Sequence, residues 1–363
     1  MNSAYHDTQA KSTGGIAATS LRHRVINLPN LLAIVIALSL IYVLASLLDF
    51  DSGDTWDRLK ATRLVWYALA FGSYYLIFPL RALRWRIFLE NAGCKMGAGA
   101  ERISILRLAE ISFLGWFVNT ITVFRMGALY RCLQLSRGIK TSIALIAGSL
   151  FAERILDTVV TFALLLVAAF ALLKTPAAPF VGPILLAGLI ASVVLAGAAI
   201  AMALAGLNAG RILPSRFRSG YVNFRQGTLK SFHRWPWLLT LSLAIWACES
   251  VRLLLVIHAL GLSVNPSLVL FVAMGASLVT SFPVTPGGLG LVEAGMVGLL
   301  ATVLTWEEAA SVAILDRSVS YLSVVFLGGA LFLVRSLWGP MSGGDLRSAT
   351  IAQPQPEQTP RLD

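Results

Sequence analysis

The stretch SIALIAGSLFAERILDTVVTFALLLVAAFALL, residues 142–173, decides the fold of this chain. It is an almost unbroken apolar run, and about 20 apolar residues suffice for a helix that crosses a bilayer. Three ionisable side chains, Glu153, Arg154 and Asp157, lie in its middle. A charge near the bilayer centre costs at least about 2.5–3.5 kcal/mol, so such residues face a bundle interior or a water-filled cavity. The stretch therefore predicts a transmembrane helix that carries buried charge.

The same combination of apolar sequence and charge recurs twice further along the chain. Glu249 and Arg252 lie within one later apolar run, and Asp316 and Arg317 lie within another. Repeated charge inside membrane helices indicates a protein that binds or moves something polar, rather than an inert anchor.

The composition of the whole chain agrees with a membrane protein. Of its 363 residues, 57% are hydrophobic and 13% are charged, with a mean hydropathy of +0.76, whereas soluble domains carry about 25% charged residues. The apolar runs are continuous, which predicts an all-α polytopic membrane protein. The net charge of +11 does not indicate nucleic-acid binding, because the basic residues lie in short loops between the runs, as cytoplasmic loops do. The cysteines and histidines form no metal-binding motif, and no cofactor is expected.

Charge bias predicts the path of the first half through the membrane. Spans are expected at residues 31–48, 64–82 and 142–173. A further apolar run at 108–124 is followed by basic residues with no acid among them. A full crossing would place these basic residues outside, against the positive-inside rule. We therefore expect a re-entrant segment that enters and leaves on the cytoplasmic side.

The second half is predicted in the same way, with spans at residues 180–207, 237–261 and 309–334. The loop 208–236 contains basic residues and no acid, so it is expected to be cytoplasmic. Two shorter apolar runs, 266–283 and 290–306, lie in a stretch without Lys or Arg. A re-entrant hairpin that enters from outside explains this absence, and two further full spans are the alternative.

The prediction is thus about six full spans plus two re-entrant elements. Each half contains two spans, a re-entrant element and a last span, and the halves begin on opposite sides of the membrane. This layout is a possible inverted repeat, which many transporters use to build a site near the midplane. Gly127 lies 26 residues before Glu153, and Gly288 lies 28 residues before Asp316, which is a weak echo of the same repeat.

The domain boundaries follow from these spans. The membrane domain is expected to cover residues 29–336. It lies between a mobile N-terminal segment, 1–28, and a disordered tail, 337–363, both polar in composition. Both termini are expected to be cytoplasmic.

The buried charges allow two interpretations. Glu153 and Asp157 are four residues apart and share a helix face, with Arg154 about 100° away. Glu249 and Arg252 are three residues apart and can also meet on one face. Either these groups form mutual ion pairs that hold helices together, or they line a hydrated cavity where some of them bind a substrate or a coupling ion.

A second candidate site lies between the last two apolar runs, at Pro286, Gly287, Gly288 and Gly290. These residues break one helix and begin another, and a helix N-terminus presents free N–H groups that suit an anion. A plain turn is the alternative. The segment is not a nucleotide-binding phosphate loop, because no Lys-Ser/Thr follows it and no strand precedes it.

A third candidate site follows the first re-entrant run. Asn119 lies near the end of the run, and Arg125 and Arg131 follow it. These arginines can clamp a phosphate, because a guanidinium recognises phosphate through paired hydrogen bonds. The alternative is that they extend to the lipid head groups.

Four groups of residues together resemble a known family. They are Arg84-Trp85-Arg86, Asn119 through Gly127 to Arg131, Glu153-Arg154-x-x-Asp157, and Pro283-x-x-Pro286-Gly287-Gly288-Leu289-Gly290-x-x-Glu293. This arrangement, over most of residues 75–335, resembles the transmembrane region of lysylphosphatidylglycerol synthases, a family with many stand-alone, flippase-like members.

The chain departs from the family's pattern at three places. It has Val123-Phe124 where Pro-Gly is usual, Ala128 where an acid is usual, and Val292 where an arginine is common. The first-half site is therefore expected to be altered. The family's aminoacyl-transferring activity resides in a separate soluble domain at the C-terminus, whereas a short polar tail follows the last span here. The resemblance therefore implies translocation rather than aminoacyl transfer.

The sequence thus favours a flippase or floppase of a bacterial inner (plasma) membrane, which moves a polar-headed lipid. The expected partner is a membrane lipid with a phosphate-bearing head group. The residues expected to contact it are Asn119, Arg125, Arg131, Glu153, Arg154, Asp157, Glu249, Arg252, Pro286, Gly287, Gly288, Gly290, Glu293, Asp316 and Arg317. The alternative is an accessory protein that binds a lipid intermediate or a partner glycosyl- or aminoacyl-transferase. An enzyme is not expected, because the sequence has no nucleophile, metal or nucleotide motif.

Overall fold

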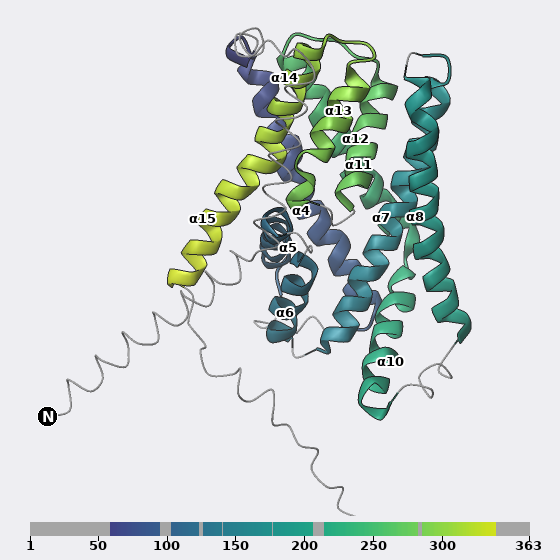
Figure 1. The fold of residues 1–363 in the computed structure, drawn as a ribbon. Helices are drawn as coiled ribbons and strands as arrows, with labels where there is room; N and C mark the ends of the chain where they lie inside the picture. Colours follow the sequence, from purple (N-terminus) through teal and green to yellow (C-terminus); the bar gives the residue numbers. More distant parts are fainter. Residues whose placement is uncertain are drawn as a thin grey trace, which may run out of the picture.

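The computed structural model describes residues 59–94, 103–122, 126–139, 141–175, 177–205, 214–281 and 285–338. Within these ranges every regular element is helical (Figure 1). Four helical segments there are long and apolar enough to cross a membrane: Ile143–Leu172, Val181–Leu204, Trp235–Ala259 and Trp306–Arg335. The prediction of an all-helical, polytopic membrane protein is confirmed. The expected span 31–48 lies outside the described residues.

The helices follow the order expected from the apolar runs. The first half contains α4 (Leu64–Asn91), α5 (Ile105–Ile121), α6 (Gly127–Ile139) and α7 (Ile143–Leu172). The second half contains α8 (Ala178–Ala205), α10 (Ser215–Leu229), the 3-10 turn η2 (Lys230–Phe232), α11 (Trp235–Ala259), α12 (Pro266–Ser281), the 3-10 turn η3 (Pro286–Gly288), α13 (Leu291–Leu300), α14 (Trp306–Arg317), the π-helical segment η4 (Ser318–Leu322) and α15 (Ser323–Trp338).

Helix α4 is longer than predicted. It continues through Asn91 instead of ending near residue 82. The sequence Arg84-Trp85-Arg86 therefore lies inside the helix and not in the loop after it. Arg84 and Trp85 are both fully buried. This is possible because residues on other helices form ion pairs with the arginine and pack against the tryptophan ring. A prediction based on hydropathy ends the helix at these arginines, since it cannot see the partners.

The first re-entrant element is an antiparallel pair of short helices, α5 and α6, which pack on each other. They have 17 and 13 residues, about 26 and 20 Å at 1.5 Å per residue, so neither covers a hydrocarbon core of about 30 Å. At their junction a Cβ atom on Gly127 would lie 1.9 Å from the carbonyl oxygen of Gly115. Only a residue without a side chain permits this approach.

The second re-entrant element is the pair α12 and α13, joined through η3. Gly287, Gly288 and Gly290 all have positive φ angles, of 59°, 75° and 80°, a conformation that glycine adopts without steric cost. Figure 1 shows α12 and α13 in the half of the bundle that holds α14, and α6 in the half that holds α10. The two hairpins thus enter from opposite ends, as predicted.

Helix packing follows the pattern of an inverted repeat. The long helices α4 and α11 pack on each other, while each hairpin packs on the last helix of the other half: α12 on α7, and α5 on α15. The hairpin tips are built alike. Asn119 and Thr280 each lie eight residues before the glycine that begins the return, and a Cβ atom on Gly127 or Gly288 would collide with them, at 2.6 and 3.0 Å.

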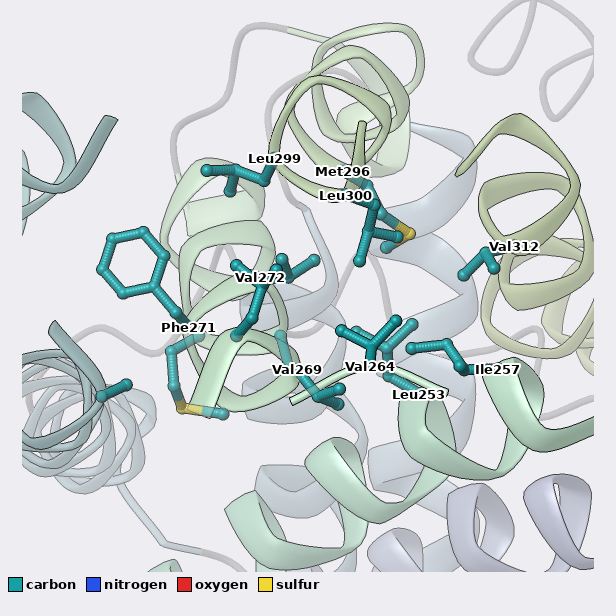
Figure 2. Packing of buried hydrophobic residues seen from close by; sticks show 14 of the residues in the cluster. Leu253, Ile257, Val264, Val269, Phe271, Val272, Met296, Leu299, Leu300 and Val312 are labelled. Carbon is teal, nitrogen blue, oxygen red and sulfur yellow. The ribbon is translucent and has the colours of Figure 1, made fainter. Parts of the chain in front are cut away.

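A buried apolar cluster holds the second hairpin in place. Figure 2 shows Val269 and Val272 of α12, with Met296 and Leu300 of α13, facing Leu253 and Ile257 of α11 and Val312 of α14. All of these side chains are buried. The hairpin is therefore packed as firmly as the spanning helices around it.

The predicted cytoplasmic loop 208–236 contains a helix that the sequence analysis missed. Helix α10 packs along α7, where a Cβ atom on Gly148 would lie 2.2 Å from the carbonyl oxygen of Phe224. The signal was present in the sequence, since Phe217, Tyr221, Phe224 and Thr228 recur at helical spacing. The many basic residues of the segment concealed it.

Candidate functional site

A cavity lies at the middle of the bundle, where the two hairpin tips meet. It is lined at the midpoints of α4, α7 and α11, by the ends of α5 and α12, and by η3, α13, α14 and η4. Its volume is about 100 Å³. A Cβ atom on Gly287 in the second tip would lie 3.5 Å from Thr120 in the first. Backbone from both hairpins therefore forms the cavity wall.

The first charged cluster beside the cavity is centred on Arg84 of α4. Its guanidinium donates to Asp157 Oδ1 and Oδ2 at 2.5 and 3.0 Å, to Glu153 Oε1 at 3.3 Å and to Ser242 Oγ at 2.7 Å. Arg84 is fully buried, and both carboxylates are nearly so. Arg131 of α6 donates to the second oxygen of Glu153 at 2.9 Å. The cluster thus joins α4, α6, α7 and α11.

Trp85 packs against this cluster. Its ring lies 4.2 Å from the guanidinium carbon of Arg131, within the range of a cation–π contact. Trp85 is fully buried, so it acts in packing and not as an interfacial anchor.

The second charged cluster has the same plan and is centred on Arg252 of α11. This arginine donates to Glu249 Oε2 at 3.2 and 3.1 Å and also to Asp316 Oδ1. Ser320 donates to the other oxygen of Asp316 at 3.4 Å. In each half, therefore, an arginine on the helix before the hairpin binds an acid on the helix after it.

The third charged pair joins α13 to α14. Arg317 lies 2.7 Å from Glu293, which occupies the first turn of α13. A carboxylate in the first turn of a helix interacts favourably with its N-terminus, so Glu293 itself supplies a negative charge there.

The π-helical segment η4 follows Arg317 and is held by tyrosines of α4. Tyr67 and Tyr75 pair with the hydroxyls of Ser318 and Ser323, and Tyr74 donates to the carbonyl oxygen of Ser320 at 3.0 Å. A π segment inside an α-helix is frequent at functional sites. Here it places Ser320 and Tyr321 in the cavity wall.

Two arginines of the cavity wall differ from all of these. Arg81 of α4 and Arg154 of α7 form no ion pair with any carboxylate in the described part of the chain. At longer range, Asp157 and Glu153 attract Arg154 and Arg81 repels it. Arg81 lies over the ring of Trp116, 4.6 Å from its centroid. Arg81 and Arg154 are therefore the cavity-lining arginines of the described chain that make no direct ion pair.

The structure separates the predicted site residues into groups. The expected shared face of Glu153 and Asp157 is confirmed, as is the contact of Glu249 with Arg252. The predicted residues in the cavity wall are Asn119, Arg154, Asp157, Glu249, Arg252, Gly287, Asp316 and Arg317. Arg131, Glu153 and Glu293 lie behind the wall in ion pairs.

The remaining predicted residues belong to the hairpin tips. Gly288 and Gly290 are buried and shape the second tip through their backbone. Pro286 begins η3. Arg125 lies outside the described residues. Most of the buried charges thus form mutual ion pairs, as the first interpretation held, and several of these pairs border a cavity. Binding of a substrate or a coupling ion there stays a prediction.

Sequence reasoning missed several residues of the wall: Tyr74, Arg81, Trp116, Ser320 and Tyr321. It also missed Arg84 as the centre of a cluster. Arg81 lies at the very end of the expected span 64–82 and Arg84 beyond it, although their spacing of three residues repeats that of Glu249 and Arg252 and could have indicated equivalent helix faces.

Comparison with known proteins agrees with this architecture. The model of the lysylphosphatidylglycerol synthase TM region matches residues 30–328. The chain belongs to this family. The match extends over both hairpins and both arginine-centred clusters, and it confirms the resemblance found in the sequence.

The relatives include three membrane proteins of archaea named only as UPF0104 proteins. MJ1078 of Methanocaldococcus jannaschii is 28% identical over 60% of this chain and 94% of its own length. A protein of Methanothermobacter thermautotrophicus is 27% identical over 82% of this chain and 92% of its length. PH1989 of Pyrococcus horikoshii is 22% identical over 73% and 85%. No solved structure matches the chain significantly. These names and the four described helices long enough to cross a membrane together support a multi-pass membrane location.

Proposed function

We propose that this protein moves a polar-headed membrane lipid from one leaflet to the other. The proposed partner is a lipid whose head group carries a phosphate. The acyl chains stay in the surrounding lipid while the head group passes through the central cavity. The proposed location is a bacterial inner (plasma) membrane, with both termini in the cytoplasm.

One observation carries this proposal: a cavity with charged walls lies at the middle of the spanning helices, between two hairpins inserted from opposite ends. A charged head group is costly to place in hydrocarbon for the same reason as a charged side chain. A polar cavity at that depth lowers this barrier. Inverted repeats build such sites at their interface, and rocking of one half against the other opens them alternately to the two sides.

The wall also suits transport better than catalysis. Its carboxylates already accept hydrogen bonds from arginines, so they are poorly placed to take a proton from a substrate. Arg154 is different, because its guanidinium forms no direct ion pair with a carboxylate of the described chain. It is the wall residue on which we base the test.

The test is lipid movement in reconstituted vesicles. Liposomes with fluorescent phospholipids are treated with a membrane-impermeant quencher, and the protected fraction is followed over time. The wild-type protein should speed the loss of protection for at least one phospholipid. Arg154→Gln should slow this movement at least about tenfold, the effect of losing one charge-assisted hydrogen bond.

The matched control is Arg137→Gln. Arg137 is exposed near the end of α6 and does not line the cavity, so movement should persist. If the wild-type protein accelerates no native membrane lipid, the transport proposal is wrong. Retention of a lipid without its movement would instead support the accessory, lipid-binding function that the sequence left as the alternative.

A further inference from the structure

We infer that the central cavity selects a head group with net negative charge and binds its phosphate between Arg81 and Arg154. This inference rests on the proposed function for the identity of the cargo as a lipid. It goes further by giving the sign of the charge, the residues that bind it and the class of head group that is rejected.

The positive and negative charges of the site do not balance. Five carboxylates lie in or directly behind the wall, and each has an arginine partner: Asp157 and Glu153 with Arg84, Glu153 also with Arg131, Glu249 and Asp316 with Arg252, and Glu293 with Arg317. Arg81 and Arg154 are the wall cations left over among the described residues. Six arginines thus face five carboxylates, an excess of one positive charge, and a head group with a free ammonium would meet no carboxylate that lacks an arginine partner.

The cavity wall contains buried hydrogen-bonding atoms that the described chain leaves without a partner. Four wall residues have a buried polar atom without a partner in the described chain: Arg81 Nε, Trp246 Nε1, Thr285 Oγ1 and Arg317 Nη2. Each of these atoms is able to donate, and the three nitrogens can only donate. Buried polar groups are normally satisfied. A ligand that satisfies these must be rich in acceptors, as a phosphate is and an ammonium is not.

Arg81 and Arg154 come from different helices and line the same cavity. Asp157 and Glu153 attract Arg154 at longer range, and Arg81 repels it, so an anion between the two arginines relieves that repulsion. Trp116 orients the Arg81 guanidinium by stacking. Asn119 accepts from the backbone N–H of Gly127 through Oδ1, which leaves its Nδ2 to donate to a ligand. A phosphate that bridges two guanidinium groups is recognised by direction as well as by charge.

The experiment measures binding, separately from transport. Purified wild-type protein in a neutral detergent is titrated with short-chain phosphatidylglycerol, phosphatidylcholine and lysyl-phosphatidylglycerol, whose net charges are negative, zero and positive. Inorganic phosphate and glycerol 3-phosphate are the soluble anions. We expect phosphatidylglycerol to bind most tightly and the lysylated lipid to bind at least about tenfold more weakly.

The variants locate the site. Arg81→Gln and Arg154→Gln should each weaken binding of phosphatidylglycerol about tenfold or more and should reduce the difference between the three lipids. Arg154→Lys keeps the charge and should retain part of the affinity. Arg137→Gln should change nothing. The lipid series with the wild-type protein needs no variant, so it decides the sign of the charge even where a substitution prevents folding.

The possible results distinguish the two proposals. Preference for the lysylated lipid, or equal binding of all three lipids, would overturn the inference and leave lipid transport standing. Selective binding of phosphatidylglycerol without its movement in vesicles would overturn transport and leave the anion site standing. Soluble phosphates that bind as tightly as the lipid would overturn the assignment to a lipid, because the acyl chains would then contribute nothing.

Discussion

Replacing Arg84 and Arg154 separately by methionine tests the division of the arginines into structural and ligand-binding groups. Methionine approximates the length of the arginine side chain and removes its charge. Arg84 is fully buried and makes four hydrogen bonds to Asp157, Glu153 and Ser242. Its removal leaves Asp157 buried without an ion pair, while Glu153 keeps Arg131.

The expected magnitude follows from these partners. Breaking a buried ion pair by removing one member costs about 3–5 kcal/mol of unfolding free energy. At roughly 2 °C per kcal/mol for a large domain, Arg84→Met should lower the melting temperature by about 6–10 °C. Arg154→Met should lower it by clearly less than Arg84→Met, because no direct ion pair is broken and the lost attraction of Asp157 and Glu153 is partly offset by the lost repulsion from Arg81.

The native cysteines provide the assay. Cys94 and Cys132 are buried, and burial raises the pKa of the Cys94 thiol to about 11, so hardly any thiolate is present near neutral pH while the protein is folded. A thiol-reactive fluorophore therefore reports unfolding when the detergent-solubilised protein is heated. The double variant Arg84→Met with Asp157→Leu should recover most of the loss, since apolar pairs replace buried ion pairs well.

Two results would refute this reasoning. One is equal destabilisation by Arg84→Met and Arg154→Met, which would mean that Arg154 also holds the fold together. The other is an Arg84→Met protein as stable as the wild type, which would mean that the buried cluster contributes nothing. In the second case the contacts around Arg84 would not explain why α4 continues into the membrane.

Three further predictions concern the hairpins and the topology. Gly127→Ala should destabilise the protein by about 1–3 kcal/mol through overpacking against Gly115, whereas Gly72→Ala, which meets nothing within 4 Å, should be neutral in the same melting assay. Gly287→Ala combines a left-handed φ of 59° with a contact of 2.6 Å to Tyr321, so it should slow lipid movement in vesicles more than Gly295→Ala, which meets nothing. Ser219→Cys and Val303→Cys, both exposed, should react with a membrane-impermeant reagent from opposite sides of the membrane; labelling from the same side would contradict the arrangement of the two hairpins.

The sequence predicted the membrane class and most of the spans, because length and hydropathy are local properties that suffice for that purpose. It also predicted both re-entrant hairpins. The first followed from basic residues without acids after a short apolar run, and the second from glycines and prolines in a stretch without basic residues. Helical periodicity placed Glu153 beside Asp157 and Glu249 beside Arg252, since neighbours on one helix face are fixed by spacing alone.

The tertiary structure alone decided which arginines form ion pairs with carboxylates and which do not. Arg84 meets carboxylates 69 and 73 residues away in the chain, and Arg81, only one turn earlier, meets none. Both have the same side chain and neighbouring positions, so no local pattern separates them. The difference arises from the distances between packed helices, which depend on how the two halves interlock. That interlocking leaves Arg81 and Arg154 facing one cavity.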